Sequence, residues 1–107
     1  MNGRERFDEI VDDLAGRDPD VVESQMMGRP SIKAGGKLIA CYEARGAMAF
    51  KLPDESEREK ALALEGAQMY DPALTGRTMG GWVEVPVAHE AKWPALAETA
   101  LRLRKAQ

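Results

Sequence analysis

The chain has 107 residues, a formal net charge of −3 at pH 7 and a hydrophobic content of 44%. This length predicts a single domain over residues 1–107, and the composition excludes a wholly disordered protein. No run of about 18 apolar residues occurs, so no membrane-spanning segment and no membrane partner are expected. The single cysteine and the lack of an apolar leader at the start predict a cytoplasmic location.

Charge is distributed unevenly along the chain. Residues 1–25 carry three arginines against eight acids, a net of −5, whereas residues 28–51 carry five cations against one acid, a net of +4. An acidic whole argues against a general nucleic-acid-binding protein, which is usually strongly basic. The basic segment is therefore either a solvated sheet surface or a local binding patch, and the solvated surface is the simpler interpretation.

The first predicted element is a helix, because Phe7, Ile10, Val11 and Leu14 recur at helical spacing. Five acids occupy its other positions, and no loop gathers them, so they predict a solvated face and not a metal site. Gly16 is the expected helix end. The following dipeptide, Asp-Pro, is typical of the start of a new helical turn.

The strongest pattern lies in residues 26–52, which predict three antiparallel strands joined by two hairpins. Gly35-Gly36 is a typical two-residue hairpin turn, because both residues can adopt positive φ. That turn would pair Ile32 with Ile39 and Lys33 with Leu38. Residues 25–27 form a possible additional short strand that leads into this sheet.

The second hairpin has two alternative registers. A two-residue turn at Arg45-Gly46 pairs Cys41 with Phe50, whereas a three-residue loop over 44–46 pairs Ala40 with Phe50. We favour the two-residue turn because it keeps the large apolar side chains together.

This register divides the strands into two faces, since successive side chains point to opposite sides of a sheet. The face expected to pack against helices contains Ile32, Ile39, Cys41, Met48, Phe50 and Leu52. The face expected to be open contains Arg29, Ser31, Lys33, Leu38, Ala40, Tyr42, Ala47, Ala49 and Lys51.

Two further helices are predicted. Asp54 is a typical N-cap with Glu57 three positions later, and this helix is expected to end at Gly66. The final helix covers about residues 91–104. Pro94 is expected in its first turn, where a missing N–H does little harm.

Between these helices the pattern predicts two strands. The first is a short strand over 68–70. The second covers 79–85, with Val83 and Val85 on one face and Trp82 and Glu84 on the other. The predicted architecture is therefore an α+β two-layer sandwich of order α-β-β-β-α-β-β-α, with a mainly antiparallel five-stranded sheet and its helices on one face.

Five short motifs together resemble one known family over about residues 7–103. They are Met26-Met27-Gly28, Gly35-Gly36-Lys37, Phe50-Lys51-Leu52-Pro53, Gly76-Arg77-Thr78-Met79 and Trp82-Val83-Glu84-Val85-Pro86. In this order and spacing they are similar to the TfoX N-terminal domain family, of which this chain resembles a stand-alone, single-domain member.

The resemblance implies the same order of helices and strands, and a relationship to the TfoX/Sxy regulators of natural competence in bacteria. Those regulators carry a second, C-terminal domain. No catalytic residue set is established for the family, so the resemblance implies none here. The chain departs from the family's common residues at Met27 (commonly Phe), at Arg29 (commonly Gly) and at Gly80-Gly81 (charged in many relatives).

Few residues suggest chemistry. Cys41 is expected in the core, where a thiol behaves as a small hydrophobic group. His89 has no neighbouring cysteine or second histidine with which to bind zinc. No serine stands in a nucleophile elbow, and neither Gly-Gly pair opens a phosphate-binding loop. The sequence therefore predicts no catalytic residue, no metal site and no cofactor, and hence a protein that is not an enzyme.

The open sheet face is the predicted binding surface. Its candidate residues are Arg29, Lys33, Tyr42, Lys51, Arg77 and Trp82, of types that often anchor interfaces. We expect a non-enzymatic interaction or regulatory module that binds a protein partner, or itself as a homodimer.

Three alternatives accompany that prediction. The two aromatic residues could be structural, with Trp82 beneath the loop at Gly76 and Tyr42 covering Ala49. The cations and aromatic rings could instead bind nucleic acid, as in a transcription or competence regulator. An enzyme for a small substrate is disfavoured, because no acid–base or nucleophile arrangement stands out.

Overall fold

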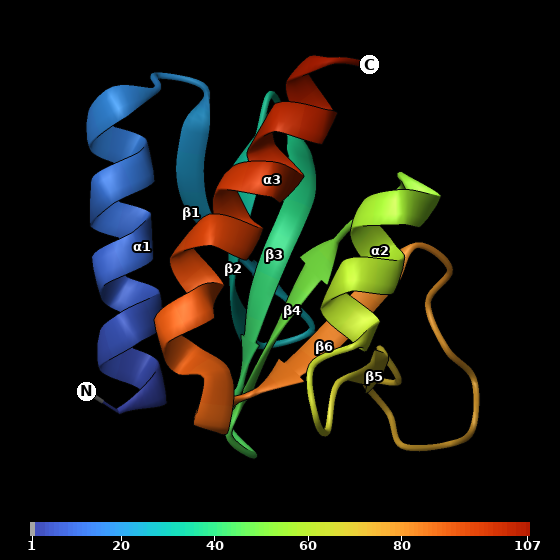
Figure 1. Cartoon of the computed structure of the whole chain (residues 1–107). Helices are drawn as coiled ribbons and strands as arrows, with labels where there is room; N and C mark the ends of the chain where they lie inside the picture. Colours follow the sequence, from blue (N-terminus) through green and yellow to red (C-terminus); the bar gives the residue numbers. More distant parts are fainter. Residues whose placement is uncertain (1) are drawn as a thin grey trace.

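Three α helices and one antiparallel sheet form two layers in the computed structural model, which describes residues 2–107 (Figure 1). The helices are α1 (Gly3–Arg17), α2 (Glu55–Leu62) and α3 (Trp93–Lys105), and a 3₁₀ helix, η1 (Val87–Lys92), precedes α3. The strands are β1 (Val21–Met26), β2 (Arg29–Ala34), β3 (Lys37–Glu43), β4 (Ala47–Lys51), β5 (Gln68–Met69) and β6 (Trp82–Pro86). The α+β prediction is confirmed, but the described chain has six strands where five were expected, because β1 is a full strand of six residues.

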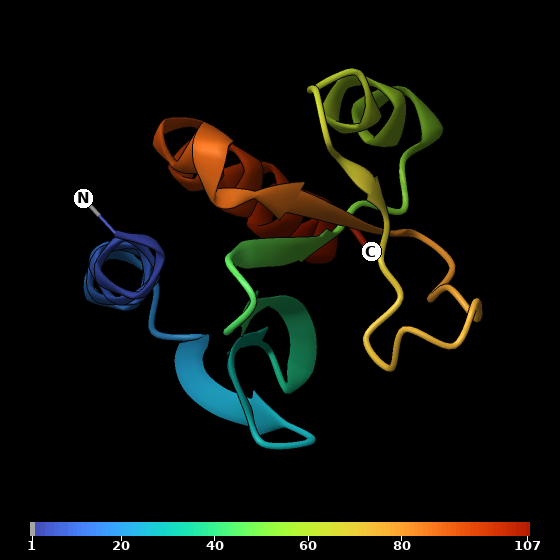
Figure 2. The ribbon, with the colours of Figure 1, turned by 90° about the horizontal axis from the view of Figure 1, so that it is seen from below.

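The sheet order is β1-β2-β3-β4-β6-β5, with every neighbouring pair antiparallel. β1 therefore forms one edge, and the two-residue strand β5 forms the other. The loop between β5 and β6 lies on the side of the sheet away from α1 (Figure 2). This loop is the first indication that the second sheet face is partly covered.

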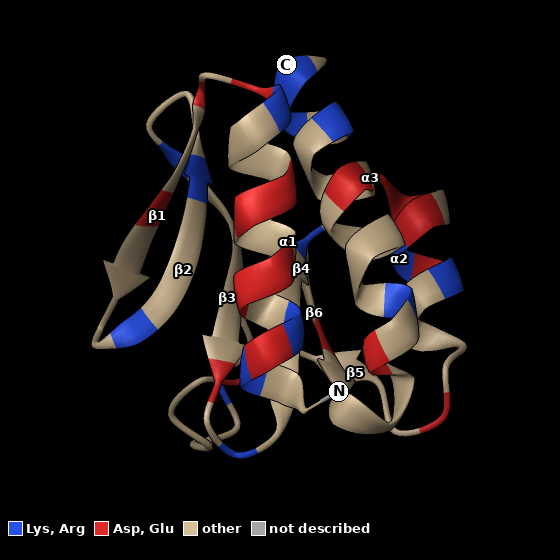
Figure 3. Ribbon diagram, turned by 90° about the vertical axis from the view of Figure 1, so that its left-hand side faces the viewer, with Lys and Arg blue, Asp and Glu red and all other residues tan. Residues whose placement is uncertain are grey.

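Helix α1 matches the predicted apolar stripe, because Phe7, Ile10, Val11 and Leu14 are all buried. Asn2 caps its start by accepting a hydrogen bond from the Glu5 N–H at 2.8 Å. Its acidic residues line the exposed side (Figure 3). The predicted end at Gly16 was wrong. The helix continues to Arg17, and a turn follows it in place of the expected new helical turn.

The later helices follow their predicted signals closely. The Asp54 side chain caps α2 by accepting from the Glu57 N–H at 3.0 Å. This helix ends at Leu62, earlier than expected, and Gly66 has a φ of 85° in the turn beyond it. Pro94 lies in the first turn of α3, as predicted.

The hairpin registers differ from the favoured prediction in two places. Lys33 pairs with Leu38 as expected, but an irregularity then pairs Ile32 with Ala40 and not with Ile39. In the second hairpin Ala40 pairs with Phe50, so the three-residue loop is correct and the two-residue turn was wrong. Because the side-chain period is two, both differences change which residues share a face.

The residues of the helix-facing core consequently differ in part from those predicted. Ile32, Met48, Phe50 and Leu52 are buried there as expected, together with Ile39. Ala40 and Tyr42 were predicted on the open face, but both belong to this core. Ala40 is buried there and Tyr42 is partly buried. Cys41, which was predicted in the helix-facing core, instead packs in a second cluster on the opposite face of the sheet. The bulge at Ile39 allows two consecutive residues, 39 and 40, to belong to one core.

Candidate functional site

The sheet surface opposite the helices has two parts, and we name them by their residues. The covered zone contains Arg29, Cys41, Glu43, Arg45, Tyr70, Trp82 and Glu84, and the loop after β5 lies against it. The open zone contains Val22, Ser24, Met26, Lys33 and Leu38, on β1, β2 and β3, and its Met26 and Leu38 pack partly buried against the edge of the covered zone. The register places the five open-zone side chains on one face.

Glu43 is the centre of the covered zone and is only 5% exposed. Arg29 lies beside it on β2, and its Nε is 2.9 and 2.8 Å from the two carboxylate oxygens. The Tyr70 hydroxyl donates to the same carboxylate. Since an unpaired buried carboxylate is costly, these donors are what make burial of Glu43 acceptable.

A second ion pair lies next to the first. Arg45 contacts the Glu84 carboxylate with its Nη2 at 2.5 Å, and Glu84 is 7% exposed. The same guanidinium donates to the backbone carbonyl of Asp71 at 3.3 Å. Arg29 likewise donates to the carbonyl of Pro72 at 2.9 Å. The two arginines thus attach the loop to the sheet.

Aromatic packing completes the covered zone. The rings of Tyr70 and Trp82 have centroids 6.0 Å apart and are tilted by 41°. Met79, in the same loop, packs partly buried against this cluster. The structural alternative for Trp82, packing beneath the loop, is therefore confirmed.

The two potentially reactive groups of the covered zone are held in their neutral forms. Burial raises the pKa of the Cys41 thiol to about 11, and its sulfur donates to the Tyr70 hydroxyl at 3.2 Å. Burial also raises the pKa of Tyr70 above its usual value, and the hydrogen bonds to Cys41 and Glu43 act in the same direction. Neither group is prepared to act as a nucleophile or base near neutral pH.

The open zone is a mixed apolar and cationic surface. Val22 lies opposite Lys33, and Lys33 lies opposite Leu38, so these three side chains form a row across β1, β2 and β3. Val22 is 50% exposed, and Met27, in the adjoining turn, is 72% exposed. No helix of the described residues lies over this row, which is on the face opposite the helix-facing core.

Of the six residues predicted to form the binding surface, two are corrected by their placement. Tyr42 faces the helices and packs on Phe7, with ring centroids 5.8 Å apart, so it neither covers Ala49 nor reaches the open face. Trp82 lies on the predicted face but is buried beneath the loop. Both errors arise from tertiary features: a bulge turns Tyr42 over, and a loop covers Trp82.

The remaining four residues do not form one cluster. Arg29 lies in the covered zone, paired with Glu43. Lys33 is in the open zone, and Lys51 lies opposite Trp82 on the same face. Arg77 is exposed on the loop. The sequence reasoning missed Tyr70 and Glu43. Alternation on β3 would have found Glu43 only with the correct hairpin register.

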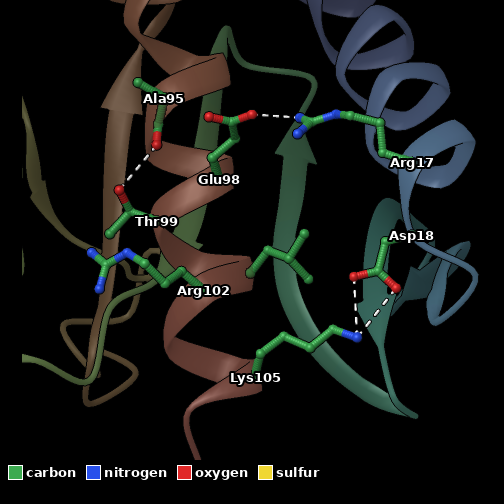
Figure 4. Close-up of a pocket in the computed structure, with 8 residues that line it drawn as sticks. Arg17, Asp18, Ala95, Glu98, Thr99, Arg102 and Lys105 are labelled. Carbon is green, nitrogen blue, oxygen red and sulfur yellow. Dashed lines mark hydrogen bonds and ion pairs between the residues drawn. The ribbon is translucent and has the colours of Figure 1, made fainter.

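A hollow with a volume of about 650 Å³ lies between the C-terminal end of α1 and the side of α3. Figure 4 shows that its charged side chains largely face one another. Arg17 pairs with Glu98, and Lys105 pairs with Asp18 at 3.1 Å. Because these charges are already compensated and the hollow is open to solvent, it has little of the character of a ligand site.

Residues 2–107 hold neither a metal-binding cluster nor a membrane-spanning helix. This part of the chain contains no group of three or more histidine, cysteine or acidic side chains that could hold a metal ion. It also contains no helix long and apolar enough to cross a bilayer.

Comparison with protein-family models, with curated proteins and with solved structures gives no match to this chain. The resemblance to the TfoX N-terminal domain family therefore stays a prediction.

Proposed function

We propose that this chain is a non-enzymatic interaction or regulatory module of the TfoX N-terminal type. It binds a protein partner, or a second copy of itself, through the open zone. The observation that carries this proposal is the row formed by the half-exposed Val22 and the partly exposed Lys33 and Leu38, on a sheet face over which no helix of residues 2–107 lies. Exposed apolar side chains next to cations are typical of protein interaction surfaces.

The chemistry of the covered zone supports a binding role over a catalytic one. Its thiol and its phenol are both protonated at neutral pH, and its carboxylates are paired with arginines. Catalysis requires a group that can exchange a proton or attack a substrate near working pH. The covered zone instead stiffens one half of the sheet and leaves the other half accessible.

The charges favour a protein over a nucleic acid as the partner. Two of the five cations in residues 28–51, Arg29 and Arg45, are paired with nearly buried glutamates. Lys33, Lys37 and Lys51 remain, in a chain whose net charge is −3. Nucleic-acid binding depends on many phosphate contacts, which three lysines supply poorly.

Light scattering on the purified chain at increasing concentration, together with capture of partners on the immobilised chain, tests the proposal. The informative variants are Val22→Glu and Leu38→Glu, each of which puts a charge into the open zone. Val87→Glu is the matched control, because Val87 is also a partly exposed valine but lies in η1. Circular dichroism verifies that each variant is folded.

We expect association to be weakened about tenfold or more by at least one open-zone variant and to be unchanged in Val87→Glu, since a charge in an apolar contact costs more than about 1.4 kcal/mol. Association that survives both open-zone variants, or a chain that binds neither itself nor any protein, would contradict the proposal. Binding to DNA or RNA that weakens with salt and with Lys33→Glu would favour the nucleic-acid alternative.

A further inference from the structure

Strand β1 is an edge strand with little of the usual protection against pairing with another chain. It is six residues long, and its register with β2 is regular throughout. Its sequence, Val-Val-Glu-Ser-Gln-Met, has no lysine and no proline. Natural edge strands are normally shortened, bulged or given proline or charged residues, and of these devices β1 has only one charged side chain, that of Glu23. In residues 2–107 no strand lies beyond β1 in the sheet (Figure 3).

The hydrogen bonds at the start of β1 establish which backbone groups point outward. The Gly35 N–H donates to the Asp20 carbonyl at 3.1 Å, so residue 20 points its backbone towards the β2–β3 hairpin. Alternate residues of an antiparallel strand bond to the same side, so Val22, Ser24 and Met26 also bond towards β2. The backbone groups of Glu23 and Gln25 therefore point to the free edge.

Val21 supports the same assignment. Its N–H donates to the Asp18 carbonyl at 3.1 Å, and so does not bond to β2. Glu23 and Gln25 share its parity, and both side chains are exposed. Two N–H groups and two carbonyls are thus presented, in strand geometry, to a strand arriving at the edge.

We propose that the occupant of this edge is a second copy of the chain, whose β1 pairs with β1 antiparallel about a two-fold axis at Ser24. This inference rests on the proposed function and specifies its partner. In this register Glu23 pairs with Gln25 of the second copy, and the two residues exchange the outward-pointing N–H···O=C bonds. Ser24 faces Ser24 of the second copy.

Side-chain complementarity selects this register. Val22 lies across from Met26 of the second copy on the open face, which covers the half-exposed valine. The neighbouring register, shifted by one pair, places Glu23 opposite its own copy, and like charges directly opposite are destabilising. A register with Ser24 at the axis avoids that repulsion and pairs apolar with apolar side chains.

The pairing has a consequence for the open zone. A two-fold axis perpendicular to the sheet keeps the same face of both sheets on one side, because paired residues must share a face. The two open zones then join into one continuous surface across the β1 strands. The dimer would present a wider apolar and cationic surface than either copy alone.

Gln25→Pro tests the edge, with Gln25→Ala as its matched control. Proline at this position removes an outward N–H and leaves the β1–β2 hydrogen bonds intact, as proline on an edge strand normally does. Alanine removes the same side chain but retains the N–H. We expect Gln25→Pro to weaken dimerisation about tenfold or more and Gln25→Ala to change it much less, measured by light scattering.

Disulfide trapping tests the register. Under mild oxidation Ser24→Cys should form a covalent dimer, because the two copies of residue 24 form a non-hydrogen-bonded pair, with Cα atoms about 4.5 Å apart. Glu23→Cys should not form a covalent dimer, since the two copies of residue 23 do not lie directly opposite each other in this register. The buried Cys41 serves as an internal negative control in both variants.

Each remaining outcome overturns the inference in a recognisable way. Cross-linking of Glu23→Cys in place of Ser24→Cys would show that the register is wrong. A dimer that resists Gln25→Pro but is lost in Leu38→Glu would refute edge pairing and leave the proposed function intact. A wild-type chain that is monomeric up to about 1 mM also refutes edge pairing, and the proposed function then depends on another protein.

Discussion

Tyr70 is the residue on which the covered zone depends most. Its hydroxyl donates to Glu43 and accepts from the Cys41 thiol, and its ring packs on Trp82. It belongs to the loop-side segment after β5, yet its polar contacts are with β3. One side chain therefore joins two distant segments of the chain by both hydrogen bonding and packing.

Tyr70→Phe should lower the free energy of unfolding by about 1 to 3 kcal/mol, because it removes a donor from a nearly buried carboxylate. Urea unfolding measures this change. Tyr42→Phe is the control, since Tyr42 is also packed by its ring but no hydrogen bond of its hydroxyl occurs within residues 2–107. Equal losses in the two variants would mean that the hydroxyl of Tyr70 contributes nothing specific.

The raised pKa of Cys41 predicts a loss of stability in alkaline solution. In the unfolded chain the thiol loses its proton near its ordinary pKa of 9.0, whereas in the folded chain it keeps the proton up to about pH 11. Between these values the unfolded state binds fewer protons, so the free energy of unfolding falls as pH rises. Below about pH 9 this loss in the free energy of unfolding is absent. By about pH 11 it is on the order of 2 kcal/mol.

Unfolding measured from pH 8 to pH 11 in the wild type and in Cys41→Ala checks this expectation. The alanine variant should be less stable at pH 8, because it leaves a small cavity, but its stability should fall less steeply with pH. The slope will not vanish, since Tyr70, with its raised pKa, contributes in the same direction. Identical slopes in the two proteins would contradict the assignment to Cys41.

At the scale of elements, the turn between β1 and β2 is a place where the sequence is locally unfavourable. Met27 and Gly28 have φ values of 51° and 81°, as in a type I′ hairpin turn. Glycine accepts this conformation readily, whereas methionine does so at a cost. The Met27 side chain is largely exposed and gains little burial in return.

Met27→Asn should therefore stabilise the protein by roughly 0.5 to 1 kcal/mol, because asparagine tolerates positive φ and Asn-Gly is the favoured type I′ pair. Thermal or urea unfolding gives the difference. Met27→Leu, which lacks this tolerance, should show no gain. Stabilisation by leucine as well would assign the effect to side-chain burial and not to the turn.

The loop after β5 is held by arginines from the sheet side, and this makes its order testable. Arg45→Met removes the contacts to Asp71 and Glu84. The Met79 amide, which donates to the Tyr70 carbonyl at 2.8 Å, should then exchange its hydrogen about tenfold faster. Arg77→Met is the control, because Arg77 lies exposed in the same loop and forms no ion pair within residues 2–107. Equal exchange in both variants would show that Arg45 does not hold the loop.

Local signals in the sequence predicted the elements well, and their errors are instructive. The N-cap at Asp54, the position of Pro94 and the apolar stripe of α1 depend on nearby residues, and all three are confirmed. The faces of Cys41 and Tyr42 depend on a bulge in β3 and on one extra loop residue. Neither the bulge nor the extra loop residue has a strong local signature. Together they place the residues that lie between them on the sheet face opposite to the predicted one.

The covered zone was unpredictable for a related reason. Glu43, Arg45 and Tyr70 come from two segments about 27 residues apart, and their contact depends on how the loop folds back. The prediction of an open face nevertheless located Lys33 and Leu38 correctly, because that hairpin keeps its regular register near Gly35-Gly36. Residues close to a well-defined turn are predictable, and residues beyond a bulge are not.

At the scale of the whole molecule, the two sheet faces have different roles. The helix-facing core and the covered zone bury the large apolar side chains and the paired charges. The open zone and the β1 edge retain unused apolar surface and unused backbone groups. On the other side of the sheet, the outer surface of α1 is acidic and exposed to solvent (Figure 3). Association is therefore expected on the side of the molecule formed by β1, β2 and β3.

Amide and methyl NMR spectra recorded over a dilution series, and with any captured partner, test this account most directly. We predict that concentration- or partner-dependent shifts concentrate on Val22, Met26, Leu38 and the outward amides of Glu23 and Gln25. The residues of the hollow between α1 and α3 should not shift. Shifts confined to that hollow or to α2, with β1 and the open zone unchanged, would contradict the account.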